Sequence, residues 1–151
     1  MKKISLIILF TQLSVFSYSQ FVARADIKEN VEGICDKKNV YALLEIFGDQ
    51  KEAVCSVKEP EIEKMLNDSV RFIKDKPDYK DKGMVSLIIN CKGEVVQCKI
   101  DNKTKNPLLD DQVVNVFKTL LSWKAGKLNG KKVDSIKLWS FEINDGKIIL
   151  K

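Results

Sequence analysis

The sequence contains no histidine among its 151 residues. This absence removes the side chain that titrates nearest neutral pH, and with it the Ser-His and Cys-His pairs of many nucleophilic enzymes. The four cysteines form no Cys-x-x-Cys motif and lack zinc-finger spacing. Adjacent acids occur at Asp110 and Asp111, where the start of a helix explains them. We therefore expect no catalytic residues, no metal site and no cofactor.

The sequence also has few prolines and only a modest net charge. Three prolines exclude a proline-rich spacer, and a net charge of +5 is too small to indicate a nucleic-acid-binding protein. Beyond the first residues no long apolar run occurs, so no stable membrane span is expected in the folded part.

The N-terminus has the pattern of a cleaved secretory signal. Met1–Lys3 is positively charged, Ile4–Phe16 is mostly apolar, and Ser17 and Ser19 are small residues at the −3 and −1 positions of a cleavage site. An uncleaved membrane anchor is the alternative, but the apolar run is shorter than the ~20 residues that a span needs. We predict cleavage after Ser19 and a periplasmic or secreted protein.

Residues 20–39 have no clear hydrophobic period and are predicted to form a loosely packed N-terminal extension. The β-rich run Val40–Phe47 and the alternating run Lys51–Val57 flank a short glycine-containing segment, a pattern that favours a hairpin. A helix through Leu43 and Leu44 is the alternative.

Two helices and a second hairpin follow. Pro60 near the start of one helix, and Asn106 with Pro107 at the start of the next, are typical helix-initiating residues. Between the helices, residues 84–89 and 95–100 alternate around a turn in which Gly93 is expected to have a positive φ. In the return strand this alternation places Val96, Cys98 and Ile100 on one face, and Val95, Gln97 and Lys99 on the other.

A strand at residues 136–143 and a short final strand at residues 148–150 complete the chain. This order predicts an α+β fold in which two helices pack on one face of a mainly antiparallel sheet. We expect one domain over residues 40–151, because a chain of this length supports a single core.

The four cysteines are expected to form disulfides in an oxidising compartment. We favour Cys35–Cys55, which leaves Cys91 and Cys98 as a second pair only if the turn between their strands is distorted. The alternative joins Cys91 to the N-terminal half through Cys35 or Cys55. Spacing alone does not decide among the three connectivities.

Several residues of the second half resemble a known family. Gly83 precedes the first strand of the second hairpin and Gly93 lies in its turn. Further matches are Pro107–Asp110 at a helix start, Trp123–Gly126, Asn129–Lys131 with Val133, and Phe141 in the last long strand. In this order, these residues resemble the C-terminal domain of TonB-family proteins over residues 78–144. The signal ending in Ser19-Gln20 and the turn at residues 90–94 are similar to small secreted TonB-like proteins of Bacteroidetes.

The resemblance implies a sheet whose last strand offers an open edge to a partner peptide, preceded here by an extra hairpin and helix. Three departures argue against energy transduction. Ala125 replaces the usual proline of Trp-x-Pro-Gly, no proline-rich spacer is present, and the N-terminal anchor is predicted to be cleaved.

We therefore expect a secreted, non-catalytic module of the cell envelope that binds a protein or peptide by strand addition, with an outer-membrane receptor among its candidate partners. The same edge also permits a homodimer. The alternatives are a small-ligand carrier or enzyme with an internal pocket, and a structural envelope protein without a specific ligand. The predicted partner-binding residues are Ser135, Ile136, Lys137, Leu138 and Ser140 of the edge, with Lys127, Lys131 and Lys132 beside it.

The stretch that leads into this strand has two interpretations. Trp123 and Trp139 suggest ligand stacking, but their amphipathic spacing favours core packing. Gly126 and Gly130 suggest a phosphate loop, but no helix follows them, which favours a tight connection.

Overall fold

The structure is a computed structural model and describes residues 22–27 and 29–151. The predicted signal, Met1–Ser19, lies outside these described residues. Among the described helices, none has the length and apolar character needed to cross a membrane.

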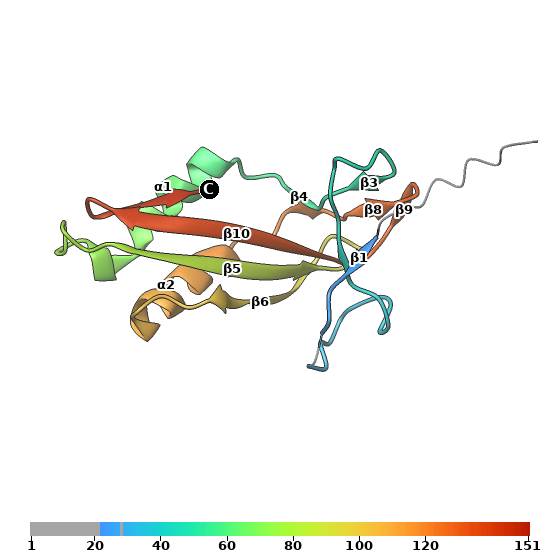
Figure 1. Cartoon of the computed structure of the whole chain (residues 1–151), viewed down its shortest axis with the longest axis horizontal. Coiled ribbons are helices and arrows are strands. Elements are labelled where there is room, and N and C mark those ends of the chain that lie inside the picture. Colours follow the sequence, from blue (N-terminus) through green and yellow to red (C-terminus); the bar gives the residue numbers. More distant parts are fainter. Residues whose placement is uncertain (1–21, 28) are drawn as a thin grey trace, which may run out of the picture.

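A twisted sheet runs along the length of the molecule and carries the rest of the fold (Figure 1). Its long strands are β5 (Asp81–Ile89), β6 (Val95–Asn102) and β10 (Ser135–Asn144), with β5 in the middle and both neighbours antiparallel to it. The shorter strands β1 (Ala23–Arg24), β2 (Tyr41–Ala42) and β11 (Lys147–Leu150) complete it. The strand order is β1-β2-β10-β5-β6, and β11 pairs with the far end of β10.

Both helices pack on one face of this sheet, as the sequence predicts. The helices are α1 (Glu59–Ser69), continued by the 3₁₀ turn η1 (Arg71–Ile73), and α2 (Pro107–Lys118). The Asn106 side chain accepts the N–H of Leu108 at 3.0 Å, which confirms the predicted N-cap. The fold is therefore α+β with a mainly antiparallel sheet.

The main core lies between the helices and the sheet. On the sheet, Val85, Leu87 and Ile89 are fully buried, and on α2 the residues at helical spacing include Val113 and Phe117, also fully buried. Each such side chain stabilises the fold by roughly 1.5–3 kcal/mol. The return strand β6 departs from strict alternation, because register shifts occur at two points of its pairing with β5. As a result Val95, Cys98 and Ile100 contact the main core, whereas Val96 packs on the opposite face.

The N-terminal extension is more tightly packed than predicted. Val31 and Val40 are buried against Ile88, on the face of the sheet that the helices leave open. Ile27 and Ile136 contact the same cluster. The prediction of loose packing is wrong because this open face presents apolar side chains, which the extension covers.

The predicted hairpin over residues 40–57 does not form. The segment contains β2, β3 (Gln50–Lys51) and β4 (Val54–Cys55), and none of these strands pairs with another of the three. Their partners are β10, β8 (Lys127–Leu128) and β7 (Trp123–Lys124), with β9 (Lys131–Lys132) outside β8. The distant stretch 123–136 supplies these pairings and thereby prevents the local hairpin.

Candidate functional site

The last long strand, β10, is not a continuous open edge. Ser135 and Ile136 pair in parallel with Tyr41 and Ala42 of β2, and residues 141–144 pair with β11. Its other side is paired with β5 over residues 135–143. The prediction of an open edge from Ser135 to Ile143 is therefore wrong at both ends, because β2, which follows the N-terminal extension, and the final strand β11 occupy it.

Only a short gap remains in the middle of β10. Lys137 forms an ion pair with Glu52, and the carbonyl oxygen of Ser140 accepts the N–H of Lys151 at 3.0 Å. Leu138 projects from the gap with 45% of its surface exposed. Ser135 is 1% exposed, and its hydroxyl has no hydrogen-bond partner within the described residues. Of the predicted contact residues on β10, Leu138 is the one most open to a partner.

Strand β6 is the long edge strand of the sheet. It pairs with β5 on one side and has no strand on the other among the described residues. It spans eight residues, and all of them are half-buried or exposed. Lys99 and Asp101 are exposed along it. An edge strand presents unpaired N–H and C=O groups that another strand can join.

Helix α2 passes beside the β6 edge. The thiol of Cys98 lies 3.8 Å from the carbonyl oxygen of Val114, so the helix passes directly over the strand. Val114 is half-buried, and the exposed Lys118 lies near enough to Cys98 to influence its thiol electrostatically. A strand added to β6 would meet backbone groups at its edge and this side of α2 above it.

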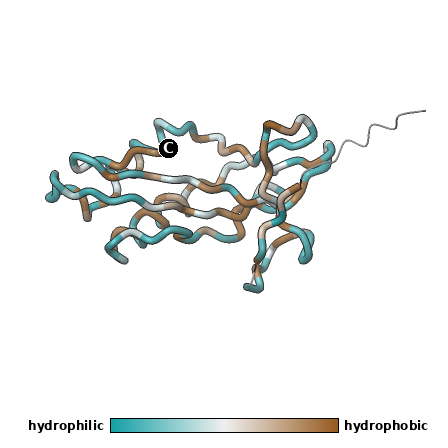
Figure 2. The backbone as a smooth tube through the Cα atoms, in the orientation of Figure 1, coloured by the Kyte–Doolittle hydropathy of each residue, from teal (hydrophilic) through white to brown (hydrophobic). Residues whose placement is uncertain are grey.

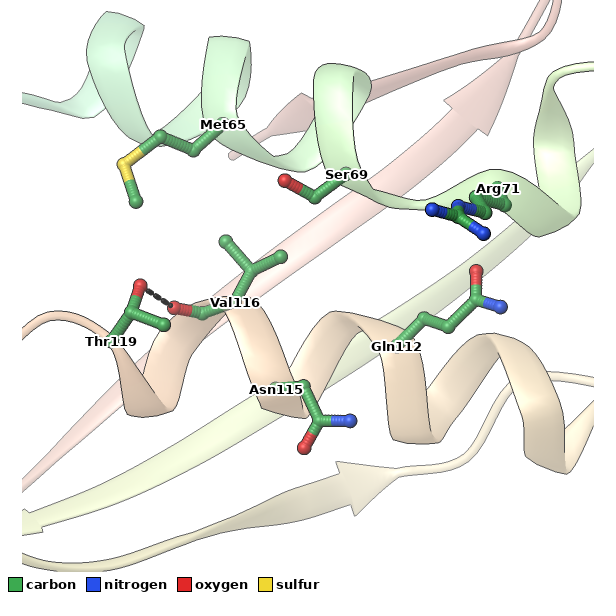
Figure 3. Close-up of a pocket in the computed structure, with 7 residues that line it drawn as sticks. All are labelled: Met65, Ser69, Arg71, Gln112, Asn115, Val116 and Thr119. Atoms are coloured by element: carbon green, nitrogen blue, oxygen red, sulfur yellow. Dashed lines mark hydrogen bonds between the residues drawn. The ribbon is translucent and has the colours of Figure 1, made fainter.

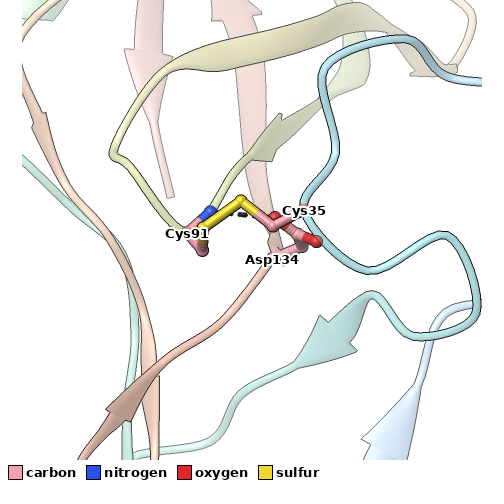
Figure 4. A group of neighbouring side chains, drawn as sticks. All are labelled: Cys35, Cys91 and Asp134. Atoms are coloured by element: carbon pink, nitrogen blue, oxygen red, sulfur yellow. Dashed lines mark hydrogen bonds between the residues drawn. A yellow bond between two sulfur atoms is a disulfide. The ribbon is translucent and has the colours of Figure 1, made fainter.

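The disulfide joins Cys35 to Cys91 (Figure 4). The preferred pairing of Cys35 with Cys55 is wrong, and the alternative that tethers Cys91 to Cys35 is confirmed. Asp134 lies beside the bridge and is 2% exposed. Its carboxylate accepts the N–H of Asp36 at 2.7 Å and the N–H of Cys91 at 2.8 Å. The acid thus binds both segments that the disulfide connects.

Cys35, Cys91 and Asp134 place three potential ligand atoms within 4.8 Å of one another. Metals bind cysteine as the thiolate, and both sulfurs here are committed to the disulfide. The arrangement therefore serves to fix the N-terminal extension to the β5–β6 turn.

Cys55 and Cys98 are free thiols, contrary to the prediction that they are disulfide-bonded. Burial raises the pKa of both, and it raises the pKa of Cys98 to about 11. Because the thiolate is the reactive form, both half-buried thiols are less reactive than an exposed cysteine.

This burial predicts slow alkylation of Cys98. At pH 8, a thiol with a pKa of about 11 has roughly a hundredfold less thiolate than one near its ordinary value. We expect iodoacetamide to modify Cys98 of the native Cys55→Ala variant about 100-fold more slowly than it modifies the urea-unfolded chain. The rate should rise with pH towards a midpoint near 11, and a midpoint near 8.5 would contradict the burial.

A groove of about 340 Å³ lies between α1, η1 and α2 (Figure 3). Met65 and Val116 form its apolar part, and Arg71 and Gln112 project into it from opposite sides (Figure 3). The Gln112 side-chain oxygen accepts the N–H of Phe72 at 3.0 Å, which holds η1 against α2. The groove lies at the small end of the size range of ligand sites and is open to solvent. It is one candidate place for the small-ligand alternative.

The predicted lysines lie on a second, smaller sheet formed by β3, β8 and β9. Lys127 is directly opposite Lys132 on one side and Lys51 on the other. Lys131 pairs with Leu128 and therefore lies on the other face. The structure thus brings together Lys127 and Lys132, separates Lys131 from them, and adds Lys51.

The two tryptophans belong to the core. Trp123 is 9% exposed, and its indole N–H donates to the carbonyl oxygen of Leu120 at 2.6 Å. Its ring lies 5.5 Å from that of Trp139, which in turn lies 5.1 Å from Phe117. The core interpretation of their spacing is confirmed.

Sequence reasoning missed the β6 edge and Lys51. Strand order decides which strand is outermost, and no local pattern encodes it. The exposed polar residues of β6 were the available signal, because a central strand of a covered sheet would be more apolar.

Comparison of the chain with models of protein families, with curated proteins and with solved structures finds no match.

Proposed function

We propose that this chain is a secreted, non-catalytic binding module of the TonB C-terminal type, and that it binds an extended peptide or protein segment by strand addition. The observation that carries the proposal is the position of β6, an eight-residue strand at the outer edge of the main sheet. Backbone hydrogen bonds along such an edge supply affinity, and alternate side chains of the added strand supply specificity.

The binding edge is β6 rather than β10. On β10, β2 and β11 occupy most of the positions that a partner strand would need. On β6, the added strand would direct alternate side chains towards Val114 on α2 and towards the opposite face, where Lys99 is paired with Glu29. Segments that alternate apolar and polar residues therefore suit this edge. Exposed segments of envelope proteins, including outer-membrane receptors, are the proposed partners.

A displayed library of nine-residue peptides tests this function. Peptides enriched on the chain are expected to alternate apolar residues with polar ones, and to slow amide hydrogen exchange in residues 95–102. Exchange in β1, at the other end of the strand order, should not change. A library without enriched sequences would favour the structural alternative, and protection confined to the groove at Arg71 and Gln112 would favour the small-ligand alternative.

Proline in β6 is expected to weaken capture of the enriched peptide at least tenfold, because it removes a backbone donor and obstructs the edge. Consecutive strand residues point their N–H groups to opposite sides of the strand. Of the two variants Lys99→Pro and Ile100→Pro, one therefore removes an N–H that faces away from β5, and that variant leaves the pairing with β5 intact. Thermal unfolding identifies the variant that retains the fold, and that variant is used for the binding measurement. Unchanged affinity in that variant would exclude strand addition at β6.

The edge also allows two copies of the chain to pair through β6. Sedimentation equilibrium of the free protein distinguishes a monomer from a dimer. A monomer that binds the peptide supports the proposed function, whereas a stable dimer that the same proline dissociates would show that the edge serves self-association.

A further inference from the structure

Three lysines form a row across the small sheet. Lys51, Lys127 and Lys132 occupy directly opposite positions on β3, β8 and β9. Directly opposite residues share a face, and neighbouring strands lie about 4.8 Å apart. The three ammonium groups therefore project from one face, from backbone positions that span about 10 Å.

No acid neutralises this row within the part of the chain that the structure describes. All three lysines are exposed, and none has an ion pair or a side-chain hydrogen bond there. Glu52, next to Lys51 in sequence, is paired with Lys137. Like charges at directly opposite positions destabilise a sheet. The row therefore acts against folding stability, which is understandable if an anionic ligand neutralises it.

An apolar loop lies beside the row. Residues 44–49 lead into β3, and in this loop Ile46 is 84% exposed and Leu44 is 40% exposed. The loop precedes β3 directly and is fixed to the small sheet, because the N–H of Leu44 donates to the side-chain oxygen of Gln50 at 3.0 Å. Gln50 lies opposite Leu128, so this contact is made on the face of the small sheet that faces away from the lysine row. The loop and the small sheet occupy the same end of the molecule, and the hydropathy colouring marks apolar residues in the loop (Figures 1 and 2).

We propose that the lysine row and Ile46 together form a docking site for an anionic membrane surface. Lysine ammonium groups complement the phosphates of lipid headgroups, and each contributes to binding near such a surface. An exposed isoleucine at a loop tip gains free energy by entering the boundary between headgroups and acyl chains. The row alone would suit any polyanion, but the adjoining isoleucine favours a lipid surface. Glu45, between the two apolar residues, and Asp49, at the end of the loop, are its acids and oppose the attraction.

This site is separate from the β6 edge, so the two proposals fail independently. The small sheet pairs β3, β8 and β9 with one another and shares no strand with the main sheet. A chain docked through the row would keep β6 available to a partner segment.

Vesicle co-sedimentation of the chain from Gln20 onward tests the site, because this piece holds every described contact. We expect binding to vesicles of phosphatidylglycerol and phosphatidylcholine in equal parts, and none to phosphatidylcholine alone. Raising the salt concentration should weaken the binding. Failure to bind the anionic vesicles at low salt would overturn the proposal.

Two triple variants with the same net charge locate the contact. Lys51→Gln, Lys127→Gln and Lys132→Gln together should lower the vesicle partition coefficient about 100-fold. The matched control changes Lys80, Lys103 and Lys147 to glutamine, at exposed positions near the other end of the long strands. It should change binding by less than threefold. Equal losses in the two variants would show attraction by net charge alone and would overturn the site.

A substitution at Ile46 distinguishes a lipid surface from a soluble polyanion. Ile46→Ser should weaken vesicle binding several-fold while leaving the binding of inositol hexakisphosphate unchanged. If Ile46→Ser has no effect on vesicles and the soluble polyanion binds stoichiometrically, the ligand is a soluble polyanion and the membrane assignment is wrong.

A stability measurement tests the repulsion within the row. Lys127→Gln alone should raise the thermal unfolding midpoint, because Lys127 has a lysine on both sides. A lowered midpoint would contradict this repulsion and, with it, the need for an anionic ligand.

Discussion

Replacing Cys35 and Cys91 with serine is expected to lower the free energy of unfolding by about 4 kcal/mol. The bridge joins residues 56 positions apart, and in the loop-entropy model a closed loop of that size restricts the unfolded chain by roughly this amount. Loss of the bridge should also loosen the extension, because the disulfide ties it to the β5–β6 turn. Urea unfolding of the oxidised protein and of the double variant measures the difference.

The matched control is the variant in which Cys55 and Cys98 are changed to alanine. It keeps the disulfide and removes only the two free thiols. Its loss of stability should be small beside that of the first variant, and reducing agent should destabilise it as much as it destabilises the unaltered protein. An equal loss of unfolding free energy in both variants would show that the disulfide adds nothing beyond the packing of its side chains. Hydrogen exchange of residues 22–42 should quicken only when the bridge is absent.

Alanine at Gly93 is expected to destabilise the protein by about 3–4 kcal/mol. Gly93 has a φ of +88°, a conformation that costs a residue with a side chain roughly 1–2 kcal/mol. A Cβ atom here would also lie 2.5 Å from the carbonyl oxygen of Trp123, and a backbone atom has little freedom to move away. Overpacking of this kind typically adds about 1–3 kcal/mol.

Gly130→Ala separates the two contributions. Gly130 also has a positive φ, of +75°, but a Cβ there meets nothing within 4 Å. Its substitution should cost about 1 kcal/mol, from the backbone conformation alone. Both variants are compared by urea unfolding. Equal costs would mean that the hairpin turn moves away from Trp123 without penalty, and the close approach would then have no role in stability.

The contrast between these glycines also clarifies the stretch from Trp123 to Val133. Gly126 does not have a positive φ, and it is buried against Leu43 and Ser135, where a Cβ would lie 2.5 Å from the Leu43 side chain. Gly126 is therefore needed for close packing, and Gly130 for a turn. The roles of both glycines are therefore structural.

Much of the local structure was predictable from sequence. The second hairpin and both helices occupy the predicted regions, and Asn106 caps the second helix as predicted. Gly93 has the expected positive φ. These features depend on residues close together in the chain. The face assignment of Val95 and Val96 failed because the register shift in β6 inserts an extra residue, which alternation does not reveal.

The candidate sites were less predictable. Lys127 and Lys132 were identified from their sequence, but their partner Lys51 is 76 residues before Lys127, and only strand pairing brings them together. The resemblance implies an open edge at the last long strand. In the fold β2 and β11 flank β10, whereas β6 has no further strand beside it among the described residues.

The class of the fold, the helices and the long strands follow from the sequence alone, because hydrophobic period, caps and turn residues act over a few positions. Three features required the folded arrangement: which cysteines join, which strand forms the open edge and which lysines align. Each depends on contacts between segments far apart in the chain, such as that of Asp36 with Asp134. Such contacts form when whole apolar faces are buried together, and several pairings satisfy the local patterns equally well. The final arrangement is selected by the joint burial of the helices, the extension and both faces of the sheet.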